Sequence, residues 1–404
     1  MGIIVQKYGG TSMGTIDRIK NVARRIIAKC EEGNQMVVVV SAMGKSTDEL
    51  IKMAYAISDA PPRRELDMLL ATGEQVSISM LSMALNAMGY DAISFTGPQV
   101  GIHTMGHHGK SRIMGIETKK IEDALNDGKI VIVAGFQGVN DNDDITTLGR
   151  GGSDTSAVAL SCVLNCPCEI YTDVDGIYGV DPRLYPPAKK LDAVSFDEML
   201  EMASLGAGVM HARAIELGSK YNAEIYVASS LHDVPGTLIA ENPPLDEARK
   251  RQMITGLAID NDELMVSLKN VPYDTNITAQ FFSNLAQKSI NIDMISQTAP
   301  VYGAINISFS APIEDLPVLR NILYNFMEKY PQVEMDINKE VSKLSVVGSG
   351  MKSQAGVASK FFNTLENNNV PIMMITTSEI RISCVIPSEL KDTAVMATAD
   401  AFNL

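Results

Sequence analysis

The chain has too little positive charge and too short apolar runs for several classes of protein. Its 34 Lys and Arg residues stand against 48 Asp and Glu residues, a formal net charge of −14. Binding to a nucleic acid backbone needs a basic surface, so nucleic acid is not expected as a main partner. No apolar run reaches the ~18–20 residues of a membrane-spanning helix. The first residues show neither the basic nor the apolar segment of a signal peptide, so the expected location is the cytoplasm.

The five cysteines and five histidines do not form a metal-binding pattern. Cys162, Cys166 and Cys168 lie close together, but no histidine is near them and no second cysteine pair completes four ligands. We expect free, buried thiols there, because an unpaired cysteine behaves as a small apolar side chain. Adjacent His107 and His108 cannot converge on one ion from a helix or strand, and their glycine-rich surroundings indicate a solvated loop. The sequence therefore predicts no metal ligands.

Length and composition indicate a soluble globular protein with two or three domains. The 404 residues are too many for one ordinary domain. Apolar residues make up 46% and charged residues 20%, so the chain can bury a large core. Disorder is therefore not expected as its main state.

The first 240 residues alternate between short apolar strands and amphipathic helices. Residues 36–40 (MVVVV) are apolar on both faces, as in a strand buried between layers of helices. Further strands are expected at 3–8, 130–134, 169–172 and 224–228, and helices at 16–32, 74–88 and 153–165. This alternation predicts an α/β domain over 1–245, a three-layer αβα arrangement with a mostly parallel sheet. In such sheets ligands bind beyond the carboxyl ends of the strands.

An internal repeat of 80 residues follows a charged segment that begins at residue 246. Residues 281–285 (FFSNL) match 361–365 (FFNTL), and 292–296 (IDMIS) match 372–376 (IMMIT). Each copy reads strand, helix, strand, strand, helix. This order predicts two ferredoxin-like βαββαβ domains, at 263–340 and 341–404.

The second copy lacks its last strand, because the sequence ends in its second helix. The first copy has such a strand at 333–337, and an unassigned apolar segment, 254–259, precedes that copy. We predict that 246–262 forms a linker and a strand that pairs into the second copy. The first copy would then be inserted within the second, and pairing of 254–259 with the first copy alone would contradict this.

Two glycine-rich turns are the best candidates for chemistry. Residues 7–12 (KYGGTS) follow a strand, and residues 149–154 (GRGGSD) precede a helix. Glycines let backbone N–H groups approach an anion closely, and a helix start adds a positive dipole end. Lys7 could neutralise charge on a transferred group, and Arg150 could clamp a carboxylate. Each turn alone could also be purely structural, with Ser153 or Asp154 capping its helix.

Two other nucleotide-binding patterns are incomplete. Gly44-Lys45-Ser46 resembles the end of a P-loop, but Val39 stands where the leading glycine would be. Residues 206–211 lack the third glycine of a dinucleotide fingerprint. A P-loop NTPase is therefore disfavoured.

The motifs, in their order along the whole chain, resemble those of the aspartate kinases of the amino acid kinase superfamily. They are KYGGTS, VVSAMGKST, ATGE, GFQG, TLGRGGSDTSA, YTDVDGIYGVDPR and EMASLGAGVMHARA. KYGGTS and GRGGSD together are highly specific. The repeat is similar to the tandem ACT domains of that family. The resemblance implies a carbamate-kinase-like αβα domain that transfers the γ-phosphoryl group of ATP to the β-carboxylate of L-aspartate, the first step towards lysine, threonine and methionine.

The resemblance also implies a role for each matching residue. Lys7 would stabilise charge on the γ-phosphoryl group, and Asp154 would orient Lys7. The aspartate pocket would comprise Glu74 at the ammonium, Arg150 at the α-carboxylate, and Ser41, Thr47, Gly151, Gly152 and Ser153. The ATP contacts would be Lys7, Tyr8, Gly9, Gly10, Thr172, Asp173, Tyr178, Asp181, Arg183 and Gly208. Mg²⁺ would travel with ATP, bound mainly by phosphates and water.

Position 208 departs from the family pattern. Some relatives carry a lysine there that reaches a nucleotide phosphate, whereas this chain has glycine and can offer only backbone. Ala355 similarly stands where proline is common, which removes a fixed φ from that loop.

The likeness to ACT domains implies feedback control by amino acids, with lysine, threonine or both as effectors. The implied effector-binding residues are Asp274, Thr275, Asn291, Ile292, Asp293 and Gln297 in the first copy, and Met351, Val357, Thr377, Ser378 and Glu379 in the second. The side chain of Ile292 could instead belong to the strand core. ACT units of the family pair across chains, which implies a homodimer or larger homo-oligomer.

Two alternative functions stay open at this point. One is another amino acid kinase that acquired ACT domains, and the other is an amino acid sensor without catalysis. Lys7, Glu74, Arg150 and Asp154 are all intact, which argues against a sensor because a sensor would not need all four.

Overall fold

The computed structural model describes residues 2–205, 209–245, 249 and 252–404. They form two compact units. The first contains the described residues up to Leu245 except Tyr178–Lys189 and Leu205, and the second contains these exceptions together with the rest of the chain. Residues 178–189 thus interrupt the continuous domain expected over 1–245. Of the charged segment expected at 246–251, only Arg249 lies within the described residues.

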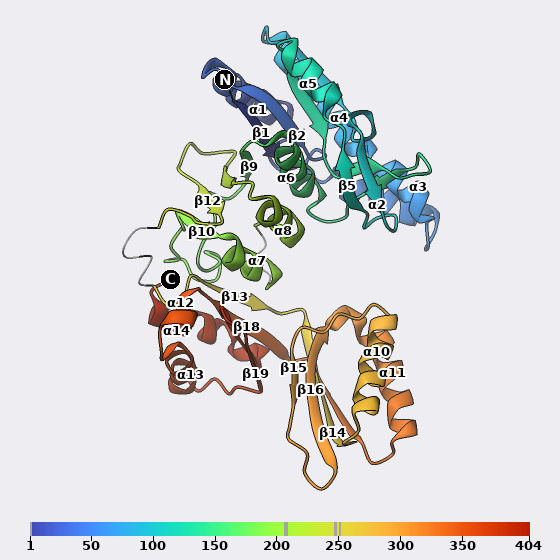
Figure 1. Cartoon of the computed structure of the whole chain (residues 1–404), viewed down its shortest axis with the longest axis vertical. Coiled ribbons are helices and arrows are strands. Elements are labelled where there is room, and N and C mark those ends of the chain that lie inside the picture. Colours follow the sequence, from blue (N-terminus) through green and yellow to red (C-terminus); the bar gives the residue numbers. More distant parts are fainter. Residues whose placement is uncertain (1, 206–208, 246–248, 250–251) are drawn as a thin grey trace. The chain divides into compact units, whose positions relative to one another are not determined.

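The first unit is built on an eight-stranded sheet (Figure 1). Its strands, in spatial order, are β10 (Ala193–Ser195), β12 (Thr237–Ala240), β11 (Ile225–Ser229), β9 (Cys168–Thr172), β1 (Ile3–Tyr8), β2 (Gln35–Val40), β6 (Ile130–Ala134) and β3 (Ala92–Phe95). Every pair is parallel except β11 with β12. The mostly parallel sheet and the strands expected at 3–8 and 130–134 are confirmed.

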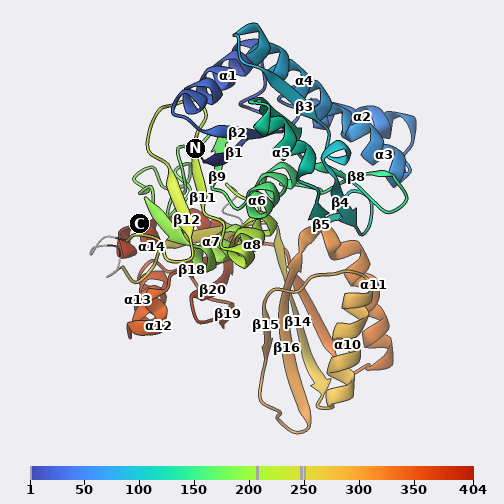
Figure 2. The same ribbon diagram turned by 45° about the horizontal axis from the view of Figure 1, so that its top comes forward.

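Helices cover both faces of this sheet, as Figure 2 shows for α1 and α4 on one side and α5 and α6 on the other. The helices described in this unit are α1 (Ile16–Glu31), α2 (Ser46–Ile57), α3 (Arg63–Leu70), α4 (Thr72–Ala87), α5 (Lys119–Asn126), α6 (Gly152–Leu164), α7 (Phe196–Ser204) and α8 (Ala212–Tyr221). Helix α1 forms because Thr15 caps its first turn and apolar residues recur at helical spacing, from Ile19 to Ile26. The three-layer αβα prediction is confirmed.

A second, four-stranded sheet packs in the same unit. Its order is β5 (Arg112–Ile116), β4 (Ile102–Met105), β7 (Gln137–Val139) and β8 (Ile145–Thr147). One helical stretch, Arg63–Ala87, is long and apolar enough to cross a membrane by length and composition alone. That is weak evidence, because the buried core helix of a globular protein passes the same test.

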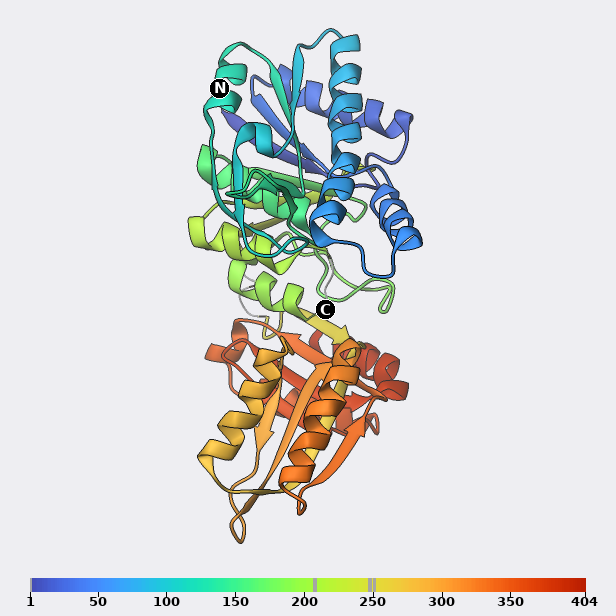
Figure 3. The same ribbon diagram turned by 90° about the vertical axis from the view of Figure 1, so that its right-hand side faces the viewer.

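The second unit contains two antiparallel four-stranded sheets, one for each copy of the repeat. The first copy comprises β14 (Glu263–Pro272), α10 (Thr275–Gln287), β15 (Ile295–Gln297), β16 (Ala304–Pro312), α11 (Leu316–Lys329) and β17 (Glu334–Asn338). The second comprises β18 (Val341–Val347), α12 (Gly350–Ser353), α13 (Val357–Asn367), β19 (Met374–Thr377), β20 (Arg381–Pro387) and α14 (Lys391–Phe402). Figure 3 shows the gold and orange helices α10 and α11 side by side over the first sheet.

The strand before the first copy completes the sheet of the second. β13 (Gly256–Asp260) pairs antiparallel with β18, in the register Gly256 to Val347 through Asp260 to Lys343. The first copy closes its own sheet with β17, which pairs with β14. The pairing predicted for residues 254–259 is therefore confirmed, and the chain enters and leaves the first copy through the sheet of the second.

Equivalent residues of the two copies meet each other. Met294 and Met374, which the 80-residue offset relates, are both buried in one cluster with Val341 and Val385. The equivalent strands β15 and β19 lie beside each other. The two copies therefore pack as two identical chains would in a symmetric dimer, with like against like.

A buried lysine ties this contact together. Lys343 on β18 is 3% exposed, and its Nζ lies 2.8 Å from Glu263 Oε1 and 2.9 Å from Asp293 Oδ2. Burial alone would lower the pKa of Lys343, but the charges of Glu263 and Asp293 outweigh it and raise the pKa above its usual value. Glu263 and Lys343 are equivalent positions of the repeat, so opposite charges occupy the two equivalent sites.

Replacing Lys343 by methionine should destabilise the second unit. The change removes the ammonium that Glu263 and Asp293 share, although Asp293 keeps its 3.5 Å ion pair with Arg381. Losing one partner of a buried ion pair costs about 3–5 kcal/mol. Urea unfolding of the full chain, monitored on the transition of the second unit, measures this loss. The exposed Lys269→Met is the control and should change the unfolding free energy by less than about 0.5 kcal/mol. If Lys343→Met also changed the unfolding free energy by less than about 0.5 kcal/mol, the stabilising role of the Lys343 ion pairs would be contradicted.

Candidate active site

Lys7 and Asp154 form an ion pair at the carboxyl end of the central strand. Successive residues of a strand point to opposite faces, so Lys7 faces α6 while Tyr8 points into the core beneath α1 and α4. Lys7 Nζ lies 2.6 Å from Asp154 Oδ1, and the two side chains are only 10% and 11% exposed. Asp154 stands in the first turn of α6, where a carboxylate is favoured by the helix dipole. The two residues predicted to be catalytic thus contact each other directly.

Two glycines are required by close approaches in the turns that surround this pair. A Cβ on Gly10 would lie 2.8 Å from the carbonyl oxygen of Ala42. Gly151 has φ +70°, and a Cβ there would lie 2.3 Å from the Cβ of His211. Gly152 follows as the first residue of α6. The backbone of both turns can therefore pack tightly only because these positions lack side chains.

The adjacent Gly9 uses its N–H within the protein. That N–H donates to the carbonyl oxygen of Tyr171 at 3.3 Å, so it is not free to bind a phosphate as the sequence suggested. A Cβ on Gly9 would lie 3.5 Å from Lys7 Nζ, so glycine here keeps the space beside the ammonium open.

Glu74 brings a buried carboxylate to the end of the neighbouring strand. Its side chain is 3% exposed, and Oε1 accepts a hydrogen bond of 3.0 Å from the N–H of Ala42, two residues beyond β2. Oε2 is buried and has no partner among the described residues. Burial raises the pKa of Glu74 to about 7, although the Ala42 N–H works against it. An unpartnered buried oxygen of this kind is suited to a cationic ligand.

Ser41 and Thr47 lie on the segment that leads away from β2. The N–H of Ser41 donates to the carbonyl oxygen of Tyr8 at 3.1 Å, which fixes Ser41 beside the end of β1. Thr47 stands in the first turn of α2. Both residues are half-buried and lie just beyond the carboxyl end of β2.

The loop before α6 exposes Arg150 and buries Ser153. Arg150 is exposed, whereas Ser153 is 7% exposed and packs against Gly135, where an added Cβ would lie 2.8 Å from Ser153 Cβ. The loop itself is fixed, since the N–H of Leu148 donates to Phe136 and the carbonyl oxygen of Leu148 accepts from Arg213. The guanidinium of Arg150 is thus free to reach a ligand from a fixed backbone.

Tyr8 and Thr172 differ in what they can offer to a nucleotide. The Tyr8 side chain is fully buried and stacks on Tyr171, with ring centroids 5.0 Å apart. Only the backbone of Tyr8 could contact a ligand, so its side chain belongs to the core rather than to the predicted ATP site. Thr172 ends β9 and donates to Asp173, and its carbonyl oxygen accepts from Ser230 at 2.7 Å.

The other predicted nucleotide residues lie in the second unit. Tyr178, Asp181 and Arg183 belong to the segment 178–189, whose Val180 and Tyr185 are buried with β13, β18 and α14. Arg183 forms an ion pair of 2.6 Å with Asp181, and this holds the pKa of Asp181 below its usual value. Gly208 lies outside the described residues.

His108 was expected in a solvated loop, and this prediction is wrong. Its Nδ1 hydrogen-bonds to Oδ2 of the buried Asp67 at 3.0 Å, and its side chain is 21% exposed. His107 is exposed, as expected. No local pattern marks this contact, because Asp67 lies 41 residues earlier in the chain.

Among the described residues, no group of three or more histidine, cysteine, aspartate or glutamate side chains could hold a metal ion. Cys162, Cys166 and Cys168 are free. Burial raises the pKa of Cys162 and Cys166 to about 11 and holds that of Cys168 well above its usual value. These thiols are therefore protonated and poor nucleophiles near neutral pH. Cys168 is buried, as predicted, whereas Cys162 and Cys166 are only partly buried.

Each copy of the repeat has a pocket where its first strand meets its first helix. In the first copy the cavity is about 290 Å³ and includes the predicted Asp274, Thr275 and Gln297. In the second it is about 580 Å³ and includes the predicted Met351, Val357, Thr377, Ser378 and Glu379. Gln354 and Gly356, within the effector loop predicted at 351–357, also line the second pocket. The sequence reasoning missed further lining residues: Tyr273, Thr278, Ala279, Phe282, Ile305, Ala358 and Ile382. The 80-residue offset relates Thr278 to Ala358, so the two cavities lie at equivalent places in the two copies.

Asn291, Ile292 and Asp293 do not line either of these pockets. Ile292 packs against the core of the first copy, as the alternative interpretation had it. Burial would raise the pKa of Asp293, but the ammonium of Lys343 and the guanidinium of Arg381 hold it below its usual value. The side chain of Asp293 is therefore engaged at the contact between the two copies.

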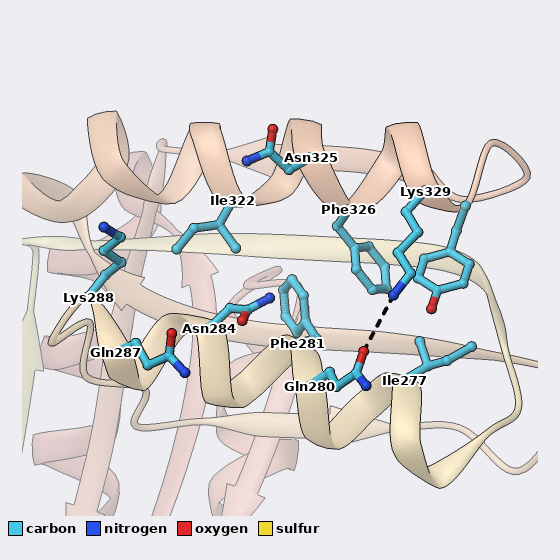
Figure 4. A pocket seen from close by; sticks show the side chains of 11 residues that line it. Ile277, Gln280, Phe281, Asn284, Gln287, Lys288, Ile322, Asn325, Phe326 and Lys329 are labelled. Carbon is cyan, nitrogen blue, oxygen red and sulfur yellow. Dashed lines mark hydrogen bonds between the residues drawn. The ribbon is translucent and has the colours of Figure 1, made fainter.

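A third cavity of about 330 Å³ lies between α10 and α11 (Figure 4). None of the predicted residues lines it. Its walls combine the aromatic rings of Phe281, Phe326 and Tyr330 with several amide side chains, and Lys329 Nζ donates to Gln280 across it at 3.4 Å.

Replacing Glu74 by glutamine should stabilise the first unit, and more so at high pH. A buried carboxyl whose pKa is raised in the folded state destabilises that state above its folded pKa and not below its unfolded pKa. The pKa of Glu74 rises from 4.5 to about 7 on folding. The stabilisation by Glu74→Gln should therefore be about 2 kcal/mol larger at pH 8.5 than at pH 5.5. Chemical denaturation at the two pH values measures it, with the exposed Glu49→Gln as control. A gain that does not depend on pH would contradict the buried ionised state.

Comparison with known proteins agrees with this architecture. The model of the amino acid kinase family matches residues 2–229, and an ACT domain model matches residues 344–402. Aspartokinase 2 of Bacillus subtilis is 47% identical over 405 residues, which cover 100% of this chain and 98% of that protein.

Two solved structures of the E. coli aspartokinase III share the fold at 22% identity. The complex with aspartate and ADP has a TM-score of 0.83 and covers 100% of both chains. The complex with lysine and aspartate has a TM-score of 0.75 and covers 99% of both chains. By its family match and its full-length similarity, the chain belongs to the aspartokinases of the amino acid kinase family.

Proposed function

We propose that the first unit transfers the γ-phosphoryl group of ATP to the β-carboxylate of L-aspartate, giving 4-phospho-L-aspartate and ADP. The observation that carries this proposal is the buried, unpartnered Oε2 of Glu74 at the same end of the sheet as the Lys7–Asp154 pair. A buried carboxylate that faces an open site selects an ammonium group, and a neighbouring lysine selects an anion. The complex of the E. coli relative with aspartate and ADP supports this choice of ligands.

The α-amino acid is held at both of its charged ends. Glu74 binds the ammonium and keeps its own charge by doing so, because a neighbouring cation lowers a raised carboxyl pKa. Arg150 binds the α-carboxylate with two parallel hydrogen bonds. Ser41, Thr47, Gly151, Gly152 and Ser153 border the pocket. The β-carboxylate is then the free end of the substrate that can attack.

The transfer itself needs no general base. A β-carboxylate has a usual pKa of about 3.9 and is already ionised at neutral pH. Catalysis therefore consists of placing two anions together and neutralising the charge that develops between them. Lys7 supplies the positive charge, and Asp154 fixes the ammonium through the 2.6 Å ion pair. No enzyme side chain has to gain or lose a proton during the transfer.

ATP supplies the phosphoryl group, and Mg²⁺ would accompany it with the phosphates and water as its ligands. The backbone at Tyr8 and Gly10 and the side chains of Thr172 and Asp173 are the contacts that we propose in the first unit. Tyr178, Asp181 and Arg183 stay nucleotide contacts that the resemblance alone predicts. Gly208 offers only its backbone.

The second unit senses amino acids in this proposal. The pockets at Asp274, Thr275 and Gln297 and at Thr377–Glu379 have the polar edges that an amino acid effector needs. The lysine complex of the E. coli relative supports lysine as one effector, and threonine is the other candidate. An effector shifts activity only by binding one conformation more tightly than another. We propose that the kinase domain comprises residues 1–245 and the ACT domains residues 263–340 and 341–404. The protein would act in the cytoplasm as a homodimer or larger homo-oligomer.

Replacing Arg150 by alanine should raise the KM for aspartate by about 100-fold and leave the KM for ATP within about twofold, since a charge-assisted bidentate contact is lost. The assay supplies MgATP and L-aspartate and traps the acyl phosphate with hydroxylamine. Product with glutamate or acetylglutamate and none with aspartate would defeat the proposed function. Unchanged aspartate affinity in Arg150→Ala would defeat only the assignment of this residue.

Filling the pocket of the second copy should relieve inhibition. Ser378→Trp places a bulky ring in a cavity that includes Thr377 and Glu379, so an effector that binds there should lose at least about tenfold in potency without a change in kcat. Lysine and threonine, tested singly and together, identify the effector. Ser359→Trp, at an exposed position of α13, is the matched control. Unchanged inhibition of the Ser378→Trp protein by both amino acids would place effector binding elsewhere.

A further inference from the structure

Asp67 is a buried carboxylate that no proposed chemical step uses. It lies on α3 with only 1% of its surface exposed. Its Oδ1 accepts from the hydroxyl of Thr147 at 2.7 Å. Its Oδ2 accepts from the N–H of Thr147 at 2.9 Å and from the N–H of Gly109 at 3.0 Å. His108 Nδ1 completes the set at 3.0 Å.

These bonds fasten two loops to one helix. Gly109 and His108 lie on the loop before β5, and Thr147 ends β8 just before the turn that carries Arg150. The two loops also touch directly, since the N–H of Ser111 donates to the carbonyl oxygen of Thr147 at 3.0 Å. A Cβ on Gly149 would lie 2.9 Å from the carbonyl oxygen of Gly109. The backbone leading to Arg150 is therefore laid against the loop that Asp67 holds.

His108 connects the buried carboxylate to charges at the surface. Its Nε2 lies 4.0 Å from Asp144 Oδ2, and Asp144 in turn accepts from Arg64 Nε at 2.6 Å. Two carboxylates thus flank one imidazole, and the guanidinium of Arg64 compensates the outer one. Without His108, the Oδ2 atom of Asp67 would lose one of its three donors and the only side chain among them.

Burying a carboxylate in this way costs free energy, and its presence here therefore indicates that its position matters. An ionised carboxyl group taken out of water costs several kcal/mol, and an apolar residue at this position would pack α3 without that penalty. Thr147 donates its hydroxyl to Oδ1 and its N–H to Oδ2, and Gly109 and His108 contact Oδ2. Asparagine has one acceptor oxygen, so it could keep the Oδ2 donors only by turning its NH2 towards the Thr147 hydroxyl. The cluster therefore favours a carboxylate, which accepts from both loops with either oxygen.

We propose that Asp67 and His108 are positioning residues for Arg150. Asp67 fixes Thr147, three residues before Arg150, and His108 keeps the Asp67 carboxylate turned towards that loop. The exposed Arg150 side chain has four or more torsions of its own, so the aim of its guanidinium depends on where this backbone is held. The inference rests on the proposed function, in which Arg150 binds the α-carboxylate of the substrate.

The test measures both Michaelis constants in the full-length protein. Asp67→Asn should raise the KM for aspartate by about 10–100-fold and leave the KM for ATP within about twofold, because only the Arg150 loop shifts. His108→Ala should raise the KM for aspartate by about three- to tenfold. His108→Asn keeps an amide donor for Asp67 and should recover most of the loss. His107→Ala, at the exposed neighbouring position, should match the unchanged protein.

A double-mutant cycle with Arg150→Ala separates positioning from general damage. If Asp67 acts through Arg150, Asp67→Asn should change the KM for aspartate by less than about twofold once Arg150 is already alanine. Equal effects of Asp67→Asn in both backgrounds, or equal increases in both Michaelis constants, would overturn the proposal. So would an unchanged KM for aspartate in His108→Ala, whose side chain is 21% exposed. Failure of the unchanged protein to phosphorylate aspartate would instead refute the proposed function.

Discussion

The ion pair between Lys7 and Asp154 is the interaction on which the site depends. It joins the carboxyl end of the central strand β1 to the first turn of α6, at 2.6 Å and with both side chains almost buried. A lysine held at this depth needs its carboxylate partner, and the carboxylate gains from the positive end of the helix. The pair fixes both the place and the orientation of the positive charge, which is what a phosphoryl transfer between two anions requires.

Strand geometry distributes the rest of the site around this pair. Because side chains alternate along β1, Lys7 faces α6 while Tyr8 enters the opposite core and stacks on Tyr171. The parallel register then brings Ser41 and Ala42, just past the end of β2, beside the same edge. Ala42 in turn orients Glu74 through its N–H. One edge of the sheet thus carries a cation and, a strand away, an anion, as an amino acid substrate needs.

Sequence reasoning succeeded where a feature is local or repeated. The strand at 3–8, the helix after GRGGSD and the pairing of β13 into the second copy all follow from motif and period. It failed where contacts join distant residues. His108 and Thr147 reach Asp67 from 41 and 80 positions away, and no local pattern marks them. The burial of the Tyr8 side chain and the membership of 178–189 in the second unit likewise depend on packing that only the folded chain specifies.

The most direct test of this account is the turnover of Asp154→Asn, compared with the unchanged protein at saturating MgATP and L-aspartate. The substitution keeps the size of the side chain and removes the charge that orients Lys7. The account predicts a kcat lower by about 100-fold or more with a KM for aspartate within about threefold, because the lost interaction acts on the transferring group rather than on the bound substrate. A kcat that stays within a few-fold of the unchanged protein would contradict the central role of the pair.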